Sequence, residues 1–291
     1  MPMSENTVSE STAADGAGSL SKAETDRFAD VGGIRLHYNE AGSGPALICT
    51  HGGGPGANAW DNSKYVFGEL SQHFRTILLD LPGYGESQKG VSRGGVPMDI
   101  FLAKLLRDFM DVTGVDRAHQ YGSSQFAPAA LRFGIEYPDR VGKIVVQSSE
   151  FGPPEGELRP GIKSLMAFAQ DPSLEKMETV FSYFTPREEF RPPELIKARY
   201  EKALTPGHLE SRREFPNPAN SDLTPELHRL QTEVLYVCGN GDGMIPVETA
   251  LDALKTIPNS RAVIWGDRSG HFVIAEHGPE YARIVTDFLT H

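Results

Sequence analysis

YGSSQFA, residues Tyr121 to Ala127, is the stretch that decides the fold of this 291-residue chain. Gly122 and Ser124 have the G-x-S spacing of a serine nucleophile on a sharp turn. The strand candidate AHQYG precedes the motif and the helical segment APAALRFGIEYP follows it, which is the context that such a turn requires. Ser124 is a better nucleophile candidate than Ser123 because glycine stands two positions before it. Phe126 replaces the glycine expected two positions after it, so the motif alone leaves an ordinary loop as the alternative.

Composition separates a short amino-terminal segment from the rest of the chain. Hydrophobic residues make up 39% of the chain and charged residues 23%, values typical of a globular protein. The net charge is −11, and residues 1–26 carry five acidic side chains against Lys22, or −4 of that total. These residues are rich in Ser, Thr, Ala, Gly and Glu and contain no apolar stretch. We therefore expect residues 1–26 to form a flexible tail.

The expected partner is a small-molecule substrate. No basic run is present, which argues against nucleic acid and anionic membranes as partners. No run of about 18 apolar residues is present either, so no membrane span is predicted, and the first residues lack the pattern of a signal peptide. Cys49 and Cys238 lie in short apolar segments and are predicted to be buried, reduced thiols. Together these features predict a cytoplasmic protein.

Strand and helix patterns alternate at both ends of the chain. The apolar runs ALICT, RTILL, GKIVVQ, EVLYVCG and RAVIWG have the length of buried strands, and residues 98–112 and 279–291 have helical spacing. This alternation predicts an α/β fold with a mostly parallel sheet flanked by helices. Residues 150–222 interrupt it with amphipathic stretches only. We therefore predict a core made of residues 27–149 and 223–291, with residues 150–222 as a helical lid.

Three further segments supply the groups that a serine nucleophile needs, namely a base, an orienting acid and oxyanion donors. Asp242 lies in GNGDGMIP after one predicted strand, and His271 lies in RSGHF after the next. The glycine run His51–Gly56 follows an earlier strand. Each feature alone has a structural alternative, a turn or a buried histidine. Their order along the chain, glycine loop, Ser124, Asp242 and His271, is that of an α/β-hydrolase fold, and it predicts a catalytic triad.

The chain from about residue 28 onward resembles the meta-cleavage-product hydrolases, carbon–carbon bond hydrolases of the α/β-hydrolase superfamily that act in bacterial aromatic catabolism. The stretches that carry the resemblance are LHYNEAGSG, HGGGPGANAWDN, LLDLPGYGES, GVDRAH, EYPDRVGKIV and GNGDGMIP. The resemblance implies that Ser124 is the nucleophile, His271 the general base and acid, and Asp242 the residue that orients His271. It implies oxyanion donors at the backbone N–H groups of Gly53 and Gln125.

The resemblance also implies a set of substrate-binding residues. Arg199 matches an arginine that contacts the substrate carboxylate, Asn62 a polar position near the substrate, and Phe272 a position usually held by Trp. A surface charge, a helix cap and core packing are the respective structural alternatives. The elbow departs from the family pattern G-N-S-M-G-G. Ser123 and Phe126 are therefore expected to shape the pocket differently from that of relatives.

The activity that the resemblance implies is hydrolysis of a carbon–carbon bond in a 2-hydroxy-6-oxo-hexa-2,4-dienoate, with no metal or other cofactor. A homo-oligomer is expected because members of the family commonly form one. The alternatives are an ester or lactone hydrolase with the same triad, a cofactor-free dioxygenase that uses His271 and Asp242 as base, and a non-catalytic ligand receptor. Turnover of a coloured dienoate separates the first reading from the others.

Overall fold

Two of the predicted apolar runs form strands that are buried on both faces. In the computed structural model, which describes residues 20–153, 156–214, 219–266 and 268–291, every residue of Ala46–Thr50 and of Val234–Gly239 is buried. Strands without an exposed face are typical of a parallel sheet that is covered by helices. The strands are β1 (Asp26–Val31), β2 (Ile34–Ala41), β3 (Ala46–Thr50), β4 (Arg75–Leu79), β5 (Ala118–Ser123), β6 (Val141–Gln147), β7 (Val234–Gly239) and β8 (Ser260–Trp265).

These eight strands form one sheet in the order β1-β2-β4-β3-β5-β6-β7-β8. The strands from β4 to β8 pair in parallel, whereas β2 runs antiparallel to both β1 and β4. The predicted α/β class with a mostly parallel sheet is therefore confirmed. β5, which ends directly before Ser124, lies in the middle of the sheet between β3 and β6. The loops after these neighbouring strands consequently meet around the end of β5.

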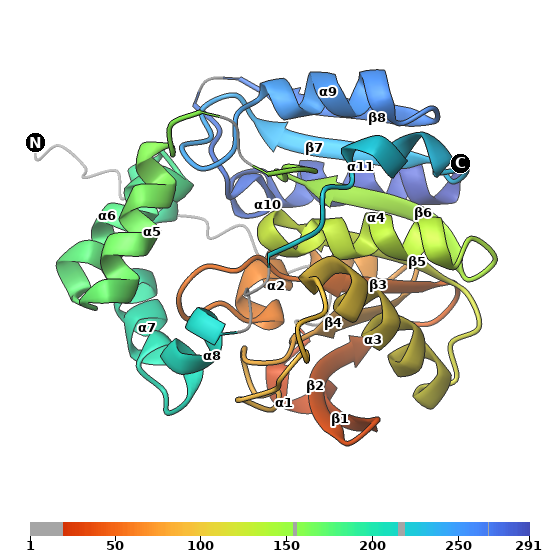
Figure 1. Ribbon diagram of the computed structural model, residues 1–291, viewed down its shortest axis with the longest axis horizontal. Coiled ribbons are helices and arrows are strands. Elements are labelled where there is room, and N and C mark those ends of the chain that lie inside the picture. The colour runs from red at the N-terminus through yellow and green to blue at the C-terminus, as the bar shows by residue number, and fades with distance from the viewer. Residues whose placement is uncertain (1–19, 154–155, 215–218, 267) are drawn as a thin grey trace, which may run out of the picture.

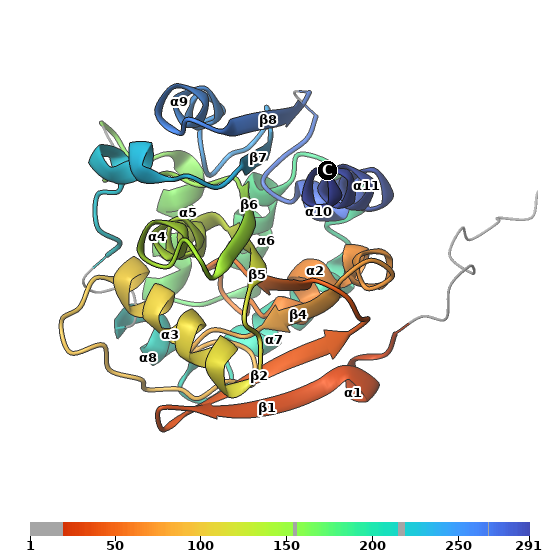
Figure 2. The same ribbon diagram turned by 90° about the vertical axis from the view of Figure 1, so that its right-hand side faces the viewer.

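Helices cover both faces of the sheet (Figures 1 and 2). One layer packs with β2, β4, β5 and β6 into the larger apolar core, and the other forms a second core on the opposite face. The first layer contains α3 (Met98–Val112), α4 (Ala127–Glu136) and α9 (Glu248–Thr256), and the second α2 (Ala59–Leu70), α10 (Val273–Glu276) and α11 (Gly278–Thr290). No helix among the described residues is long and apolar enough to cross a membrane.

Only residues 20–26 of the predicted flexible tail can be compared with the structure. Residues 1–19 of the expected flexible tail lie outside the described residues. Residues 22–25 form a short helix, α1, whose start is closed by a capping box between Ser21 and Glu24, and β1 begins at Asp26. The Glu24 carboxylate accepts a hydrogen bond from the Ser21 amide, and the Ser21 hydroxyl accepts one from the Glu24 amide. Residues 20–26 are therefore ordered, and a tail that extends to residue 26 is too long.

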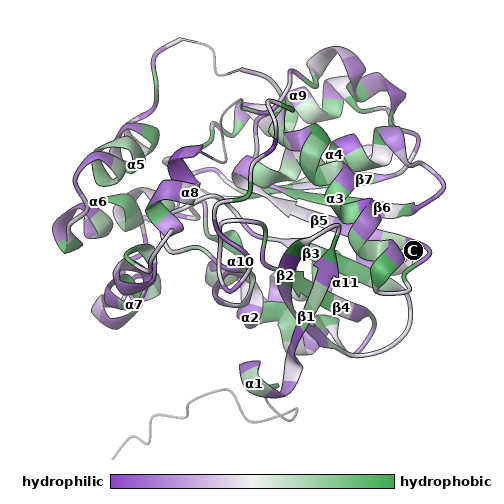
Figure 3. Ribbon diagram, turned by 60° about the horizontal axis from the view of Figure 1, so that its bottom comes forward, coloured by the Kyte–Doolittle hydropathy of each residue, from purple (hydrophilic) through white to green (hydrophobic). Residues whose placement is uncertain are grey.

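Four helices stand between β6 and β7 and contribute a separate apolar cluster. They are α5 (Pro160–Gln170), α6 (Leu174–Phe184), α7 (Pro193–Ala203) and α8 (His208–Glu214), and they are called the insertion helices below. Phe168, Met177, Phe181 and Ile196 are buried in their shared cluster. Figure 1 shows these helices beside one end of the sheet. In Figure 3, α7 is largely purple and α4 mainly green, because α7 is a surface helix and α4 is buried along nearly its whole length.

Candidate active site

Ser124 lies on a strained turn between β5 and α4. Its φ angle is 52°, in the left-handed region that residues other than glycine rarely adopt. A Cβ atom on Gly122 would lie 2.6 Å from the Cα of Ala127, so only glycine allows the chain to fold back this tightly. The turn continues as a short 3-10 helix, Ser124–Phe126, and presents Ser124 to a cavity. This geometry is that of a nucleophile elbow.

Asp242 and His271 form a buried pair on the loops after β7 and β8. The His271 Nδ1 and Asp242 Oδ2 atoms lie 2.7 Å apart. The other carboxylate oxygen of Asp242 accepts hydrogen bonds from the amides of Met244 (2.7 Å) and Ile245 (3.0 Å), which fix its orientation. This contact favours the tautomer in which Nδ1 carries the proton and donates a hydrogen bond to Asp242, which leaves Nε2 as the proton acceptor.

Hydrogen bonds hold the backbone of His271, and a stacked aromatic ring holds its imidazole. Its amide donates to the carbonyl of Phe184 (2.6 Å), and its carbonyl accepts from Gln147 Nε2 (3.2 Å). The rings of Phe184 and His271 stack with centroids 5.6 Å apart and planes inclined by 17°. Phe184 ends α6, so an insertion helix sets one face of the imidazole. These contacts leave the ring few alternative rotamers.

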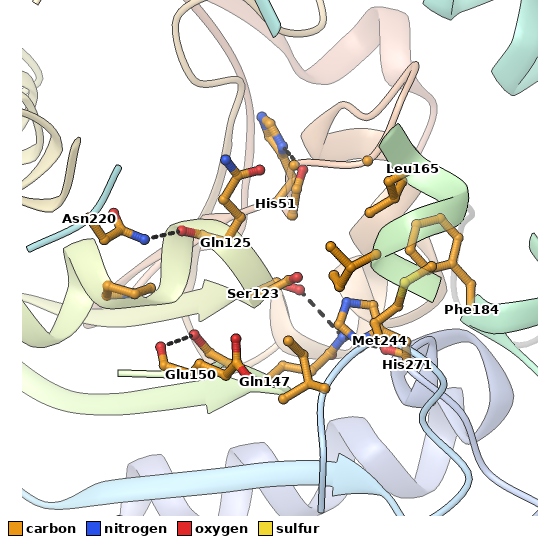
Figure 4. A pocket seen from close by; sticks show the side chains of 18 of the residues that line it. His51, Ser123, Gln125, Gln147, Glu150, Leu165, Phe184, Asn220, Met244 and His271 are labelled. Atoms are coloured by element: carbon orange, nitrogen blue, oxygen red, sulfur yellow. Dashed lines mark hydrogen bonds between the residues drawn. The ribbon is translucent and has the colours of Figure 1, made fainter. Parts of the chain in front are cut away.

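Ser124 and His271 line the same cavity of about 790 Å³, together with residues from the sheet loops and the insertion helices. Within the described part of the chain, no hydrogen bond joins the Ser124 hydroxyl to the imidazole. Such bonds often become short only when a substrate is bound, so the arrangement suits a nucleophile and its base. Figure 4 shows Gln125, Glu150 and Asn220 on one side of the cavity and Phe184 and Met244 on the other.

The glycine run after β3 lies against the elbow. A Cβ on Gly52 would lie 3.2 Å from the Cβ of Ser124, and one on Gly53 only 1.7 Å from Gln125 Oε1. Larger residues would therefore push the loop away from Ser124. Gly53 and Gln125, the two predicted sources of oxyanion N–H donors, both line the cavity on either side of Ser124.

His51 orients the peptide that carries the Gly53 N–H. Its Nε2 accepts a hydrogen bond from the Leu81 amide (3.1 Å), so Nδ1 bears the proton and donates it to the Gly52 carbonyl (2.8 Å). Burial lowers the pKa of His51, which keeps this tautomer neutral. In a planar trans peptide the N–H points away from the carbonyl. The Gly53 N–H is therefore directed away from His51.

Arg199, on α7, is a buried cation. Its Nη1 donates to Asn62 Oδ1 (3.1 Å) and its Nε to the Pro55 carbonyl (3.3 Å), and only 2% of the residue is exposed. Burial lowers its pKa to about 10, which still leaves it charged at neutral pH. Among the described residues no acidic side chain forms an ion pair with Arg199. A buried guanidinium in this state favours binding of an anion.

Asn62 and Arg199 line the cavity together, and neither of their structural alternatives describes them, while their contact with a substrate stays a prediction. The cap of α2 is Asn58, whose side chain accepts from the Asp61 amide (2.8 Å), so Asn62 is not a helix cap. Arg199 is not a surface charge because α7 directs it inward. Phe272 also lines the cavity and packs against Phe184 with ring centroids 5.4 Å apart.

Phe126 does not line the cavity, contrary to the prediction that it shapes the pocket. It is fully buried and packs edge-on against His51 (5.6 Å) and Tyr84 (5.3 Å). The turn that exposes Ser124 directs the residue two positions later into the larger core. Ser123, the other departure from the family pattern, does line the cavity, and its hydroxyl accepts from Gln147 Nε2 (3.4 Å).

Sequence reasoning missed several residues of the cavity wall. Gln147 ends β6 and bonds Ser123, the His271 carbonyl, Tyr121 and Tyr281. Glu150 and Asn220 lie in the loops that flank the insertion helices and also line the cavity. The only signal in the sequence for Gln147 is a polar residue at the end of an otherwise apolar run.

One group among the described residues has the spacing of metal ligands, and it lies at the amino-terminal edge of the sheet. It comprises Asp26, His37 and Glu86. His37 bonds Asp80 through Nδ1 (2.7 Å) and Asp26 through Nε2 (2.8 Å). Burial opposes the charged ring, but the carboxylates outweigh this effect and raise its pKa. Both ring nitrogens thus already have carboxylate partners at hydrogen-bond distance, which suits a structural His–carboxylate cluster rather than a metal site.

Comparisons with known proteins agree with this geometry. A family model described as alpha/beta hydrolase fold matches residues 45–278. The chain is 31% identical to a 2-hydroxy-6-oxo-6-phenylhexa-2,4-dienoate hydrolase of Burkholderia cepacia, covering 93% of this chain and 98% of that protein. It is 32% identical to a 2-hydroxy-6-oxononadienedioate/2-hydroxy-6-oxononatrienedioate hydrolase of Burkholderia vietnamiensis (strain G4 / LMG 22486), covering 88% and 91%. A mutant of the meta-cleavage product hydrolase CumD superposes with a TM-score of 0.83 at 25% identity, covering 92% and 99%.

Proposed function

We propose that this chain, which belongs to the meta-cleavage product hydrolases of the α/β-hydrolase fold family, hydrolyses a carbon–carbon bond in a 2-hydroxy-6-oxohexa-2,4-dienoate formed by ring cleavage of an aromatic compound. The observation that carries the proposal is the cavity itself. It combines a serine on an elbow, an oriented histidine and a buried arginine that forms no ion pair with the described acidic residues. A substrate with both a reactive ketone and a carboxylate uses all three.

Binding places the carboxylate of the dienoate at Arg199, where two parallel N–H donors match two oxygens. Asn62 holds the guanidinium from the side of α2. The dienol then takes up a proton at C5 and becomes the keto tautomer. This step makes the later cleavage feasible because the new C2 carbonyl, conjugated through C3 and C4, can accept the electron pair released at C5.

Ser124 attacks the C6 ketone while His271 Nε2 takes the hydroxyl proton. Asp242 stabilises the resulting imidazolium through Nδ1. The oxyanion on C6 accepts hydrogen bonds from the Gly53 and Gln125 amides, and one such donor is typically worth about 3 kcal/mol. The C5–C6 bond then breaks, the acyl group stays on Ser124, and the proton from His271 reaches the C2 oxygen of the leaving dienolate.

Water completes the cycle. His271 removes a proton from a water molecule that attacks the acyl-serine ester, and Ser124 is released with its proton restored. One water molecule is consumed, and the products are a carboxylic acid and 2-hydroxypenta-2,4-dienoate. Residues of the insertion helices, among them Ile162, Leu165 and Phe184, line the cavity over these groups. We assign residues 150–222 the role of a lid that limits access of bulk water.

The protein is also proposed to act in the cytoplasm as a homo-oligomer. Support for self-association comes from the edge of the sheet. Strand β8 has no neighbour on one side among the described residues, and Ile264 on it is 41% exposed. Leu251 and Leu254 of the adjacent helix α9 are also exposed. An unpaired edge with apolar side chains is a common site of association, and light scattering of the purified protein tests it.

Loss of the dienoate chromophore tests the reaction. The wild-type protein should bleach a 2-hydroxy-6-oxohexa-2,4-dienoate, and Ser124→Ala should reduce kcat by about 10⁴-fold or more, as loss of a triad nucleophile does. Ser123→Ala is the matched control and should reduce kcat by less than about tenfold, because its hydroxyl only accepts a hydrogen bond from Gln147.

Two results would contradict the proposal. Retention of dienoate cleavage by Ser124→Ala would show that the serine is not the nucleophile, as in a cofactor-free dioxygenase. Hydrolysis of p-nitrophenyl esters with no bleaching of any dienoate would identify an ester hydrolase.

A further inference from the structure

Charged side chains occupy two positions on the wall of the active-site cavity, and the proposed mechanism uses only one of them. Arg199 and Glu150 are the only Asp, Glu, Lys or Arg residues among the described residues that line it. We propose that Glu150 is a specificity-determining residue. It restricts the enzyme to dienoates whose 6-acyl tail is uncharged and excludes tails that end in a carboxylate. This inference rests on the proposed function, since it names the substrate class of the same site.

The sheet order places the two charges on opposite sides of the elbow. β3 and β6 are the two neighbours of β5, which carries Ser124 at its end. On the β3 side, a Cβ on Gly54 would lie 3.4 Å from Arg199 Nη2, so the guanidinium lies beside the glycine loop. Glu150 stands on the loop that follows β6. Figure 4 shows Glu150 on the side of the cavity opposite Phe184, which itself contacts the position of Gly54.

A bound dienoate spans these two sides. With its carboxylate at Arg199 and its C6 ketone at Ser124, the acyl tail beyond C6 extends away from the glycine loop. It therefore extends toward the loop after β6. The cavity as a whole is lined mainly by apolar side chains, which include Pro128, Phe151, Ile162, Leu165 and Met166, and Glu150 is the only acidic side chain among its described lining residues. Such a wall accommodates an aryl or alkyl tail.

The Glu150 carboxyl group is not neutralised by a contact. Within the described ranges it forms no side-chain hydrogen bond and no ion pair, and it is half-buried. Burial raises its pKa, Asp242 acts in the same direction, and Arg159 opposes them. Arg159 itself donates to the backbone carbonyl of Asp242 (2.9 Å) and does not line the cavity. A tail carboxylate would thus meet a second carboxyl group in a partly dry site, with no cation to receive it, which is unfavourable.

A pair of substrates that differ in the tail tests this inference. The specificity constants for 2-hydroxy-6-oxo-6-phenylhexa-2,4-dienoate and 2-hydroxy-6-oxononadienedioate are compared in the wild type, Glu150→Gln and Glu150→Lys. We expect the wild type to prefer the phenyl substrate by about 100-fold. Glu150→Gln should reduce this preference by about tenfold, because like charges in a partly buried site repel each other. Glu150→Lys should reduce it further.

Glu157→Gln is the matched control. Its carboxylate is 85% exposed and pairs with Lys163, and the substitution should leave the preference within twofold of the wild-type value. Dissociation constants of the two dienoates in the Ser124→Ala background measure the preference without turnover. They separate this inference from the proposed reaction, because a preference for the phenyl compound in binding that Glu150→Gln reduces supports the role of Glu150 whether or not the wild type bleaches a dienoate. Equal affinity for the two compounds, or a preference that Glu150→Gln and Glu150→Lys both leave unchanged, overturns it.

Discussion

The sheet loops and the insertion helices place their functional groups in different ways. Asp242, His271 and Ser124 stand on tight turns at strand ends, where backbone hydrogen bonds and a positive φ angle fix them. Arg199 lies within helix α7, and its position depends on side-chain contacts with Pro55 and Asn62. The sheet therefore sets the proposed reacting groups, whereas packing of the insertion helices sets Arg199, the proposed carboxylate-binding group.

The two regions meet at the glycine loop. Helix α8 contacts this loop twice, since Arg212 Nε donates to the Gly53 carbonyl (3.0 Å) and His208 Nε2 accepts from the Gly56 amide (3.0 Å). Helix α7 is linked to α2 by an ion pair between Lys202 and Asp61. The oxyanion loop is therefore supported from both sides. A change in either region is expected to alter the other through these contacts.

The largest expected effect is on the stability of the core beneath the elbow. Phe126→Ala removes a fully buried ring between His51 and Tyr84, and it should lower the free energy of unfolding by about 3–5 kcal/mol. Urea unfolding measures this change. Leu254→Ala, at an exposed position, should change it by less than about 0.5 kcal/mol. Equal effects of the two substitutions would mean that Phe126 does not support the elbow.

The next effect separates binding from chemistry. Arg199→Gln removes the charge that holds the substrate carboxylate, and it should lower kcat/KM for a dienoate by about 100-fold, mainly through KM. Hydrolysis of p-nitrophenyl acetate, which has no carboxylate, should fall by less than about threefold. Steady-state kinetics with both substrates measure the difference. An equal loss with both would show that Arg199 supports the fold of the site rather than the substrate.

A smaller effect concerns the attachment of α7 to the core. Burial alone would raise the pKa of Asp61, but hydrogen bonds from Lys202 and Asn58 outweigh it and hold the pKa at about 2. Because the folded-state pKa lies below the unfolded value, the pair stabilises the fold above about pH 4. This contribution is lost as the pH falls from about 4 to 2, by about 2 kcal/mol.

Hydrogen exchange of the α7 amides between pH 5 and pH 2.5 measures this loss, with β5 as the internal reference. Lys202→Met should raise the pKa of Asp61 and move the loss to higher pH. If hydrogen exchange in α7 and in β5 changes with pH to the same extent in the wild type and in Lys202→Met, the Asp61–Lys202 pair does not attach α7 locally to the core.

The smallest expected effect concerns Gly53 and Gln125, the two residues whose amides are proposed to bind the oxyanion. Gly53→Ala places a Cβ where Gln125 Oε1 now lies, and the flexible amide must move into the cavity. We expect kcat/KM to fall by about tenfold, within the range for disturbed oxyanion donors. The double variant Gly53→Ala with Gln125→Ala should recover most of this loss. No recovery would indicate that the added methyl group disturbs the loop itself.

Much of the fold and part of the site could be predicted from the sequence. The runs ALICT and VLYVCG are short and continuously apolar, and they became the fully buried strands β3 and β7. Gly122, two residues before Ser124, predicted a sharp turn. The structure gives the physical reason, since a Cβ at Gly122 would collide with Ala127. The catalytic roles of Ser124, Asp242 and His271 remain predictions, since the structure shows their geometry and not their chemistry.

Other residues could not be placed in this way. Phe126 was expected at the pocket because its position in the motif is unusual, but motif spacing does not say to which side of a turn a side chain points. Gln147 and Glu150 were missed because the last residue of β6 and the loop after it carry no motif. Their roles depend on neighbours that are distant in the chain, such as His271, 124 residues beyond Gln147.

The sequence by itself determined the order of strands and helices, the turn at Ser124 and the need for glycines beside it, because these depend on apolar periodicity and local backbone sterics. Only the tertiary structure decided which charges share the cavity. Arg199 and Glu150 line one cavity, since the sheet order brings the loops after β3 and β6 to either side of the end of β5 and Arg199 of α7 bonds to the glycine loop. Contacts between such distant segments follow from packing of the whole chain, which no single stretch of sequence specifies.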